Sequence, residues 1–194
     1  VQMYPISLSP DGKLALAEAN ADTIDIYVIS LDGATEPEPY LVTSFLERDP
    51  VFSPDGRWVA YASNESGRFQ IYVRPYPAAG GRWQVSDESG RWPLWSQDGS
   101  ELFYRTNEGV MVADIDADGP TFRVGKARKL FEGAFRGGIQ GIALAGFVFP
   151  DYDVAKDGQR FVMFPDDDDK LAETQATFVF NWFDELETTL PSAK

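Results

Sequence analysis

The segment Phe52-Ser53-Pro54-Asp55-Gly56-Arg57-Trp58-Val59-Ala60-Tyr61 contains a tight turn between two short apolar runs. Proline presets the φ angle of the second turn position, aspartate favours the next one, and glycine accepts the left-handed conformation in which two twisted strands pair. The segment therefore predicts a β-hairpin with its corner at Asp55-Gly56.

The same corner recurs along the chain. Equivalent pairs stand at Asp11-Gly12, Asp98-Gly99 and Asp157-Gly158, and the intervals between successive glycines are 44, 43 and 59 residues. A period of about 40–45 residues is typical of propeller blades, and the longest interval fits this period with an insertion of about 15 residues in the stretch 133–149.

Further strand-like runs complete each unit. In the second unit, a third strand is predicted at Gln70-Ile71-Tyr72-Val73-Arg74 and a fourth at Arg82-Trp83-Gln84-Val85-Ser86. We therefore predict an all-β fold, a β-propeller of four four-stranded antiparallel blades at residues 1–43, 44–86, 87–131 and 132–194. Open blade ends expose apolar faces and unpaired edges, so the alternatives are half of a larger propeller, a small closed ring, or a homo-oligomeric ring completed by two chains.

The run from Phe52 to Tyr61, with Ser63-Asn64-Glu65-Ser66-Gly67 after it, resembles the TolB-like, WD40-like repeats of bacterial β-propellers. The resemblance recurs at all four corners and covers essentially the whole chain. The later segments are similar to the closing half of propellers that end many bacterial proteins, some of which carry a serine/threonine kinase domain. The resemblance implies a binding module, and it favours a periplasmic or extracellular location over a cytoplasmic one.

Composition excludes several classes of function. The chain has 17 basic and 31 acidic side chains, and this net charge of −14 repels phosphate backbones and anionic lipids, so we expect no nucleic-acid or membrane partner. It has no cysteine and no histidine, which excludes thiolate nucleophiles, Cys/His zinc sites, histidine-based triads and the His-Arg-Asp segment of kinases. We therefore expect a non-catalytic binding or scaffold module that presents loops to a protein, peptide or small ligand.

Two alternatives stay open. The chain could be the sensor or regulatory C-terminal part of a larger bacterial enzyme such as a serine/threonine kinase. It could also be a carboxylate-based hydrolase, with Asp49 and Glu88 as one possible pair, because two carboxylates at the right separation suffice for glycoside hydrolysis.

Candidate partner-binding residues lie in the loops that enter the innermost strand of each blade or join its second and third strands. Arginine and tryptophan are enriched at binding hot spots. The alternative is that these arginines pair with nearby carboxylates and hold blade to blade. The candidates are Arg48, Asp49, Arg68, Arg91, Trp92 and Gln140.

The segment Asp114-Ile115-Asp116-Ala117-Asp118-Gly119 has the alternating carboxylates that open a calcium loop. The twelfth position of that loop is Gly125 rather than glutamate, and residues 110–115 are predicted as a strand. We therefore expect no cofactor, with calcium at Asp114, Asp116 and Asp118 as the alternative.

Overall fold

The computed structural model describes residues 2–20, 22–33, 36–77, 80–118, 121–133, 142–144, 147–150, 152–163 and 177–179. Every regular element in these residues is a β-strand. Within this part of the chain no helix could serve as a membrane span.

Two sheets of four antiparallel strands, each paired in chain order, form the first half of the described chain. The strands of the first sheet are β1 (Gln2–Leu8), β2 (Lys13–Ala19), β3 (Ile24–Ser30) and β4 (Glu38–Leu41). The strands of the second sheet are β5 (Glu47–Phe52), β6 (Trp58–Ser63), β7 (Gln70–Pro75) and β8 (Trp83–Gln84). Both sheets are therefore simple meanders.

The third sheet follows the same order, and a fifth strand pairs with its third one. Its strands are β9 (Arg91–Trp95), β10 (Glu101–Arg105), β11 (Gly109–Asp116), β12 (Arg123–Val124) and β13 (Arg128–Glu132). The fourth sheet has three strands in the described residues, β16 (Tyr152–Val154), β17 (Phe161–Met163) and β18 (Thr177–Val179). A separate hairpin of β14 (Ile142–Leu144) and β15 (Phe147–Phe149) falls in the predicted insertion.

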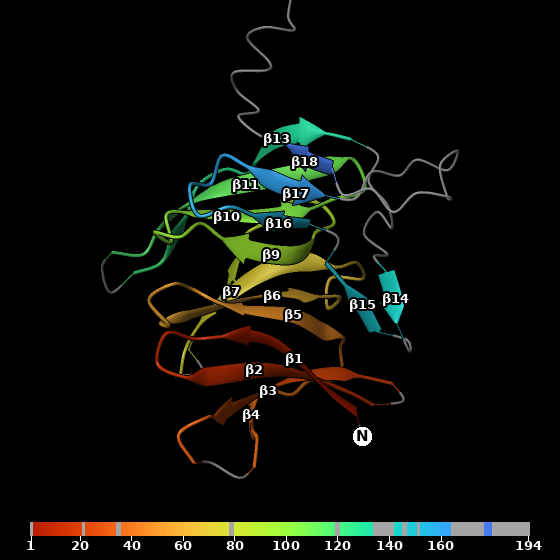
Figure 1. Ribbon diagram of the computed structural model, residues 1–194. Coiled ribbons are helices and arrows are strands. Elements are labelled where there is room, and N and C mark those ends of the chain that lie inside the picture. Colours follow the sequence, from red (N-terminus) through yellow and green to blue (C-terminus); the bar gives the residue numbers. More distant parts are fainter. Residues whose placement is uncertain are drawn as a thin grey trace, which may run out of the picture.

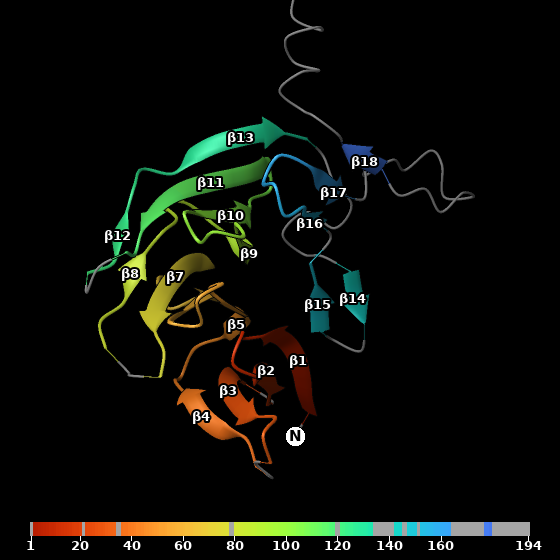
Figure 2. The ribbon, with the colours of Figure 1, turned by 60° about the vertical axis from the view of Figure 1, so that its left-hand side comes forward.

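The first three sheets are stacked face to face in chain order (Figure 1), and the fourth packs on the third through Phe161 and Met163. Figure 2 shows that the first strands β1, β5, β9 and β16 lie toward a common centre, while the later strands fan outward. This arrangement confirms the predicted all-β propeller of antiparallel blades. We refer to the sheets as the first to fourth blades.

Alternation along β6 explains why the second blade is buried on both faces. Ala60 and Ala62 face the third blade and belong to a cluster with Leu102, whereas Tyr61 packs toward Ile26 of the first blade. Successive side chains of a strand point to opposite faces, so a central blade needs apolar residues at almost every position. The strand Trp58–Ser63 meets this requirement.

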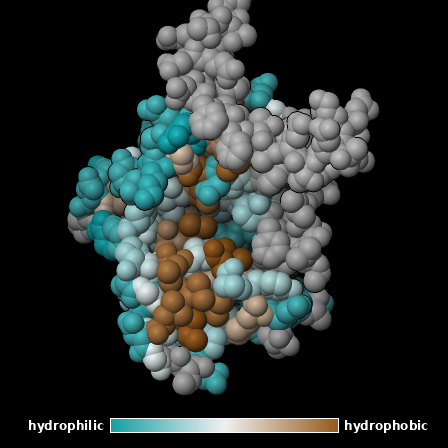
Figure 3. All heavy atoms as spheres, in the orientation of Figure 1, coloured by the Kyte–Doolittle hydropathy of each residue, from teal (hydrophilic) through white to brown (hydrophobic). Residues whose placement is uncertain are grey.

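Apolar side chains also reach the surface near the first blade. In the described residues, all large hydrophobic side chains that are exposed belong to the first blade or to its link with the second. They are Met3, Leu8, Leu31, Val42 and Phe45. Figure 3 shows apolar residues gathered over the lower part of the molecule, where β1, β2 and β5 lie in the same view of Figure 1.

Candidate binding surface

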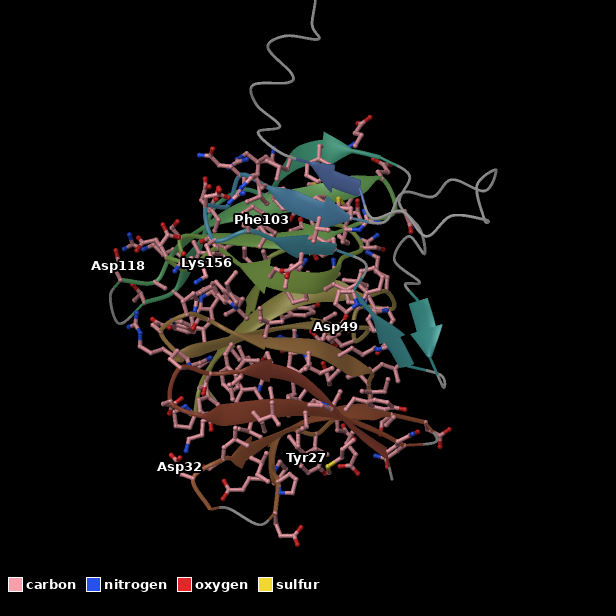
Figure 4. The ribbon with its side chains drawn as sticks, viewed as in Figure 1. Tyr27, Asp32, Asp49, Phe103, Asp118 and Lys156 are labelled. Carbon is pink, nitrogen blue, oxygen red and sulfur yellow. The ribbon has the colours of Figure 1, made fainter. Side chains whose placement is uncertain are left out.

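The connections between strands lie at two opposite ends of the blades. The Asp-Gly corners, which join the first and second strands, lie at one end together with the links between third and fourth strands. In Figure 4, Asp32, Asp118 and Lys156 lie at this corner end, and Asp49 lies toward the other end. The second end carries the turns between second and third strands and the links from blade to blade, which we call the link end.

The corners use their own polar groups to hold their shape. The four corner glycines have positive φ angles, from 68° at Gly158 to 80° at Gly12. At the third corner, the carboxylate of Asp98 accepts hydrogen bonds from the Ser100 N–H at 3.0 Å and from the Ser96 hydroxyl at 2.7 Å. These bonds lower the pKa of Asp98. The carboxylate is therefore already occupied.

Hollows of about 260 and 220 Å³ separate successive corners. Their acidic corner residues include Asp55, Asp98 and Asp157, each bound by donors of its own turn. The carboxylates of the turns themselves are therefore already bound by local donors, and they contribute to the shape of the corners.

A buried ion pair joins the second and third blades. Arg91 Nε donates to Asp49 Oδ2 at 2.7 Å, and the two side chains are 3% and 6% exposed. Arg48 is also buried, and this burial, together with the positive charge of Arg91, lowers its pKa. These residues therefore lie between the blades. The ion pair of Arg91 with Asp49 matches the predicted alternative, in which arginines pair with carboxylates and join neighbouring blades.

Asp49 and Trp92 occupy equivalent positions in β5 and β9, four residues before Ser53 and Ser96. Both have left-handed backbone, with φ of 55° and 53°, and both precede a proline. This conformation is strained, since residues before proline are normally extended. Tyr152 of the fourth blade donates its hydroxyl to the buried carbonyl of Trp92 at 2.6 Å. The contacts between neighbouring first strands thus hold the strained positions in place.

The link from the second to the third blade is firmly anchored. The Ser86 hydroxyl accepts from the Ile71 N–H at 2.9 Å, and Arg68 donates to the carbonyl of Asp87 at 3.1 Å. Gly90 is required by packing, because an added Cβ would lie 2.9 Å from Ile71 Cγ1 and 3.0 Å from Tyr104 Cδ2. The link therefore presents Asp87 and Glu88 from a fixed backbone.

These two carboxylates border a hollow of about 260 Å³ at the link end, which we call the acidic hollow. It combines charged groups with apolar surface from the third blade. Its lining residues are Asp87, Glu88, Tyr104, Thr106, Glu108, Met111, Ala127 and Lys129.

The charges of the acidic hollow are not balanced. Lys129 Nζ is paired with Glu108 at 2.8 Å and with Glu132 at 2.7 Å. Among the residues that the structure describes, the carboxylates of Asp87 and Glu88 have no hydrogen-bond or ion-pair partner. Burial and the charges of these two carboxylates raise the pKa of the Tyr104 phenol. The hollow is therefore electronegative around a neutral aromatic ring.

The structure places the predicted partner-binding residues in different settings. Arg48, Asp49, Arg91 and Trp92 are buried between blades, and Gln140 lies outside the described residues. Arg68 alone lies beside the acidic hollow, through its bond to Asp87. Tyr104 and Met111 were not singled out from the sequence, because their pattern is that of ordinary strand residues.

The three aspartates of the predicted calcium loop are exposed. Asp114 Oδ1 lies 3.7 Å from Arg128 Nη2, and Asp116 Oδ2 lies 3.6 Å from Arg123 Nη1. In the described part of the chain, no group of three or more acidic side chains has a spacing that could hold a metal ion.

Comparison with known proteins identifies the fold. No family model matches the chain, and no curated protein matches it. The chain is similar to the solved structure of TolB from Agrobacterium tumefaciens, with 22% identity and a TM-score of 0.57 over 69% of this chain and 50% of that chain. The fold is that of TolB-like β-propellers.

Two further structures share the TolB-like fold. A protein from Lactobacillus plantarum has 21% identity and a TM-score of 0.54, covering 92% of this chain and 54% of that chain. Oligogalacturonate lyase in complex with manganese has 17% identity and a TM-score of 0.57, covering 91% of this chain and 47% of that chain. The chain thus spans about half the length of the propellers that it matches, and the predicted TolB-like resemblance is confirmed.

Proposed function

We propose that this TolB-like chain is a non-catalytic binding module whose acidic hollow receives a basic side chain of a protein or peptide partner. The observation that supports the proposal is the pair of unpaired carboxylates, Asp87 and Glu88, held beside the ring of Tyr104. The anchored link fixes the backbone from which both carboxylates extend, which lowers the entropic cost of binding.

The chemistry of the hollow favours lysine or arginine as the occupant. A guanidinium or ammonium group would pair with Asp87 and Glu88, while its aliphatic stem would lie along Met111. The net charge of −14 would also attract a cationic partner over a longer range. A peptide with one or more exposed basic residues is therefore the partner class that we propose.

The proposal that the chain is non-catalytic rests on the environments of the two carboxylates that a hydrolase would need. Asp49 is buried against Arg91, whereas Glu88 is exposed at the acidic hollow, so the suggested hydrolase pair offers no two free carboxylates. The similarity to a lyase is at 17% identity and concerns the fold.

A regulatory role within a larger enzyme is the second candidate. It rests on the resemblance of the later segments to the closing half of propellers that end many bacterial proteins, some of which carry a kinase domain. The same acidic hollow would then bind a regulatory peptide segment. The resemblance to TolB-like repeats favours a periplasmic or extracellular location, which fractionation of the source cells would test.

Fluorescence anisotropy would test the binding proposal. The probes are labelled twelve-residue peptides that carry either four arginines or, at the same positions, four glutamates. We expect the arginine peptide to bind, with affinity falling as salt rises. The double variant Asp87→Asn, Glu88→Gln should weaken this binding by at least about tenfold, which corresponds to 1.4 kcal/mol.

The matched control removes two negative charges at a site away from the acidic hollow. Asp32→Asn with Glu36→Gln changes two exposed acids in the link between β3 and β4 and should leave the affinity unchanged. Equal binding of the arginine peptide to both double variants, or equal binding of both peptides to the unaltered chain, would contradict the proposal.

A further inference from the structure

Five Asp-Gly pairs are described in full by the structure, and they share one chemical reactivity. The backbone nitrogen of the glycine can attack the side-chain carboxyl group of the aspartate, because glycine has no side chain that shields its nitrogen. Four of these pairs are the corners, and the fifth is Asp32-Gly33, in the link between β3 and β4. Asp118 is also followed by a glycine, but Gly119 lies outside the described residues.

The corners hold the nitrogen that would attack. At every corner the glycine N–H donates to the carbonyl of the residue three positions earlier, over distances from 2.9 Å at Gly56 to 3.2 Å at Gly12. Gly56 and Gly99 are also packed against the preceding corner, since an added Cβ would lie 3.4 Å from Pro10 Cδ and 3.6 Å from Pro54 Cδ respectively. The nitrogen must therefore leave a hydrogen bond before it can react.

The corners hold the carboxyl group as well. Asp98 accepts hydrogen bonds from the Ser96 hydroxyl at 2.7 Å and from the N–H and hydroxyl of Ser100 at 3.0 and 2.8 Å. Asp55 accepts from the N–H and Nε of Arg57 at 3.0 and 2.6 Å. The attack requires a neutral carboxyl group that can turn toward the glycine nitrogen, so these bonds to the ionised form oppose it.

Asp32 and Gly33 lack both kinds of protection. The Leu31 N–H donates to the carbonyl of Gly12 at 2.9 Å, but the next two residues are exposed. Among the residues that the structure describes, the carboxylate of Asp32 and the N–H of Gly33 have no hydrogen-bond partner. Gly33 has a φ of 95°, and no described atom would lie within 4 Å of a Cβ added to it. Figure 4 shows Asp32 at the corner end of the first blade.

We propose that Asp32 is a site of spontaneous isoaspartate formation, and that the hydrogen bonds of the corners protect their aspartates from the same reaction. The nitrogen of Gly33 attacks Cγ of the protonated Asp32 carboxyl group, and the N–H proton leaves with the carboxyl hydroxyl as water. Water then opens the succinimide. Addition at Cγ restores aspartate, whereas addition at the backbone carbonyl carbon of Asp32 leaves the chain linked through Cγ, as isoaspartate.

The modified residue keeps its negative charge and places its Cβ in the main chain. This lengthening falls in an exposed link, where changes of the backbone are tolerated better than in a strand. Asp32 lies at the corner end and the acidic hollow lies at the link end. The inference is therefore independent of the proposed function.

Peptide mapping of the folded chain tests the proposal. Trypsin places Asp32 in residues 14–48 and Asp98 in residues 92–105. After incubation at neutral pH, mass spectrometry with electron-transfer fragmentation distinguishes isoaspartate from aspartate of the same mass. We expect isoaspartate to form at least about tenfold faster at Asp32 than at Asp98. Similar rates at the two positions would overturn the proposal.

The chain unfolded in urea is the matched control, because unfolding removes the corner bonds and leaves the sequence unchanged. The rates at Asp32 and Asp98 should then become similar. If the excess at Asp32 persists in urea, the neighbouring residues rather than the fold cause it, and the protective role of the corners is wrong.

Two variants assign the product and the protection. Asp32→Glu should remove isoaspartate from the peptide 14–48, because glutamate would have to form a larger ring, and product that remains there would show that Asp32 is not the site. Ser96→Ala with Ser100→Ala removes both hydroxyl donors to Asp98 and should raise its rate several-fold, while the rate at Asp55 stays the same. An unchanged rate at Asp98 would contradict the protection by these bonds.

Discussion

Arg91 of β9 donates to the carboxylate of Asp49 of β5 over 2.7 Å, and this bond joins the innermost strands of two neighbouring blades. The two residues are 42 positions apart in the chain, close to one repeat. The pair also lies where both strands carry a left-handed residue before proline. Contacts between repeats, rather than within them, therefore determine the geometry near the centre of the propeller.

Replacing Asp49 with asparagine should destabilise the chain strongly. Asparagine tolerates the left-handed backbone of this position, so the change chiefly removes the charge that compensates buried Arg91. We expect a loss of about 3–5 kcal/mol in the free energy of unfolding, measured by urea denaturation. Arg123→Gln breaks an exposed pair with Asp116 and should cost less than about 1 kcal/mol. Similar losses in both variants would contradict this view of Asp49.

The corner serines should contribute a stabilisation that the fourth corner lacks. Ser96 accepts a hydrogen bond from the Glu101 N–H at 2.9 Å, whereas the fourth corner has Ala155 at the equivalent position. Ser96→Ala should lower the free energy of unfolding by about 1 kcal/mol, and Ala155→Ser should raise it by up to the same amount. Urea midpoints would measure both changes. Shifts of the same sign in the two variants would disprove the equivalence of the corners.

Buried Glu47 predicts a pH dependence of stability. Burial raises its pKa above the ordinary value of 4.5, since the hydrogen bond from Thr43 only partly offsets the loss of water. A carboxyl with a raised folded-state pKa stabilises the fold fully below its unfolded-state pKa, and this stability is lost as the pH rises through the folded-state pKa. Lowering the pH from 7 to 4.5 should therefore stabilise the unaltered chain relative to Glu47→Gln. A difference between the two that does not vary with pH would show that Glu47 titrates normally.

The sequence was sufficient for the fold because the decisive signals are local. The aspartate and the glycine that all four corners share are enough to mark each turn, and the regular spacing of the corners then implies equivalent sheets. The insertion near residues 133–149 was visible as a lengthened interval, and the structure places the hairpin of β14 and β15 there.

The candidate site could not be found in the same way. Arg91 and Trp92 have residue types common at binding surfaces, but a partner in another repeat buries them. Tyr104 is one of the five residues of β10. Nothing in the sequence of this strand shows that the ring of Tyr104 lies beside Asp87 and Glu88. Burial and proximity between repeats are properties of the assembled blades, so only the structure reveals them.

The radial arrangement of the blades is the claim on which the other conclusions depend, and pulsed electron spin resonance can measure it. The chain has no cysteine, so spin labels can be placed at chosen pairs of introduced cysteines. One pair, at Pro10 and Gln97, reports on corners near the centre of the first and third blades, and the other, at Asp32 and Asp118, reports on outer links of the same blades at the same end. Blades that fan out from an axis predict a longer distance for the outer pair than for the inner pair. Equal distances would mean parallel stacked sheets and would contradict the propeller.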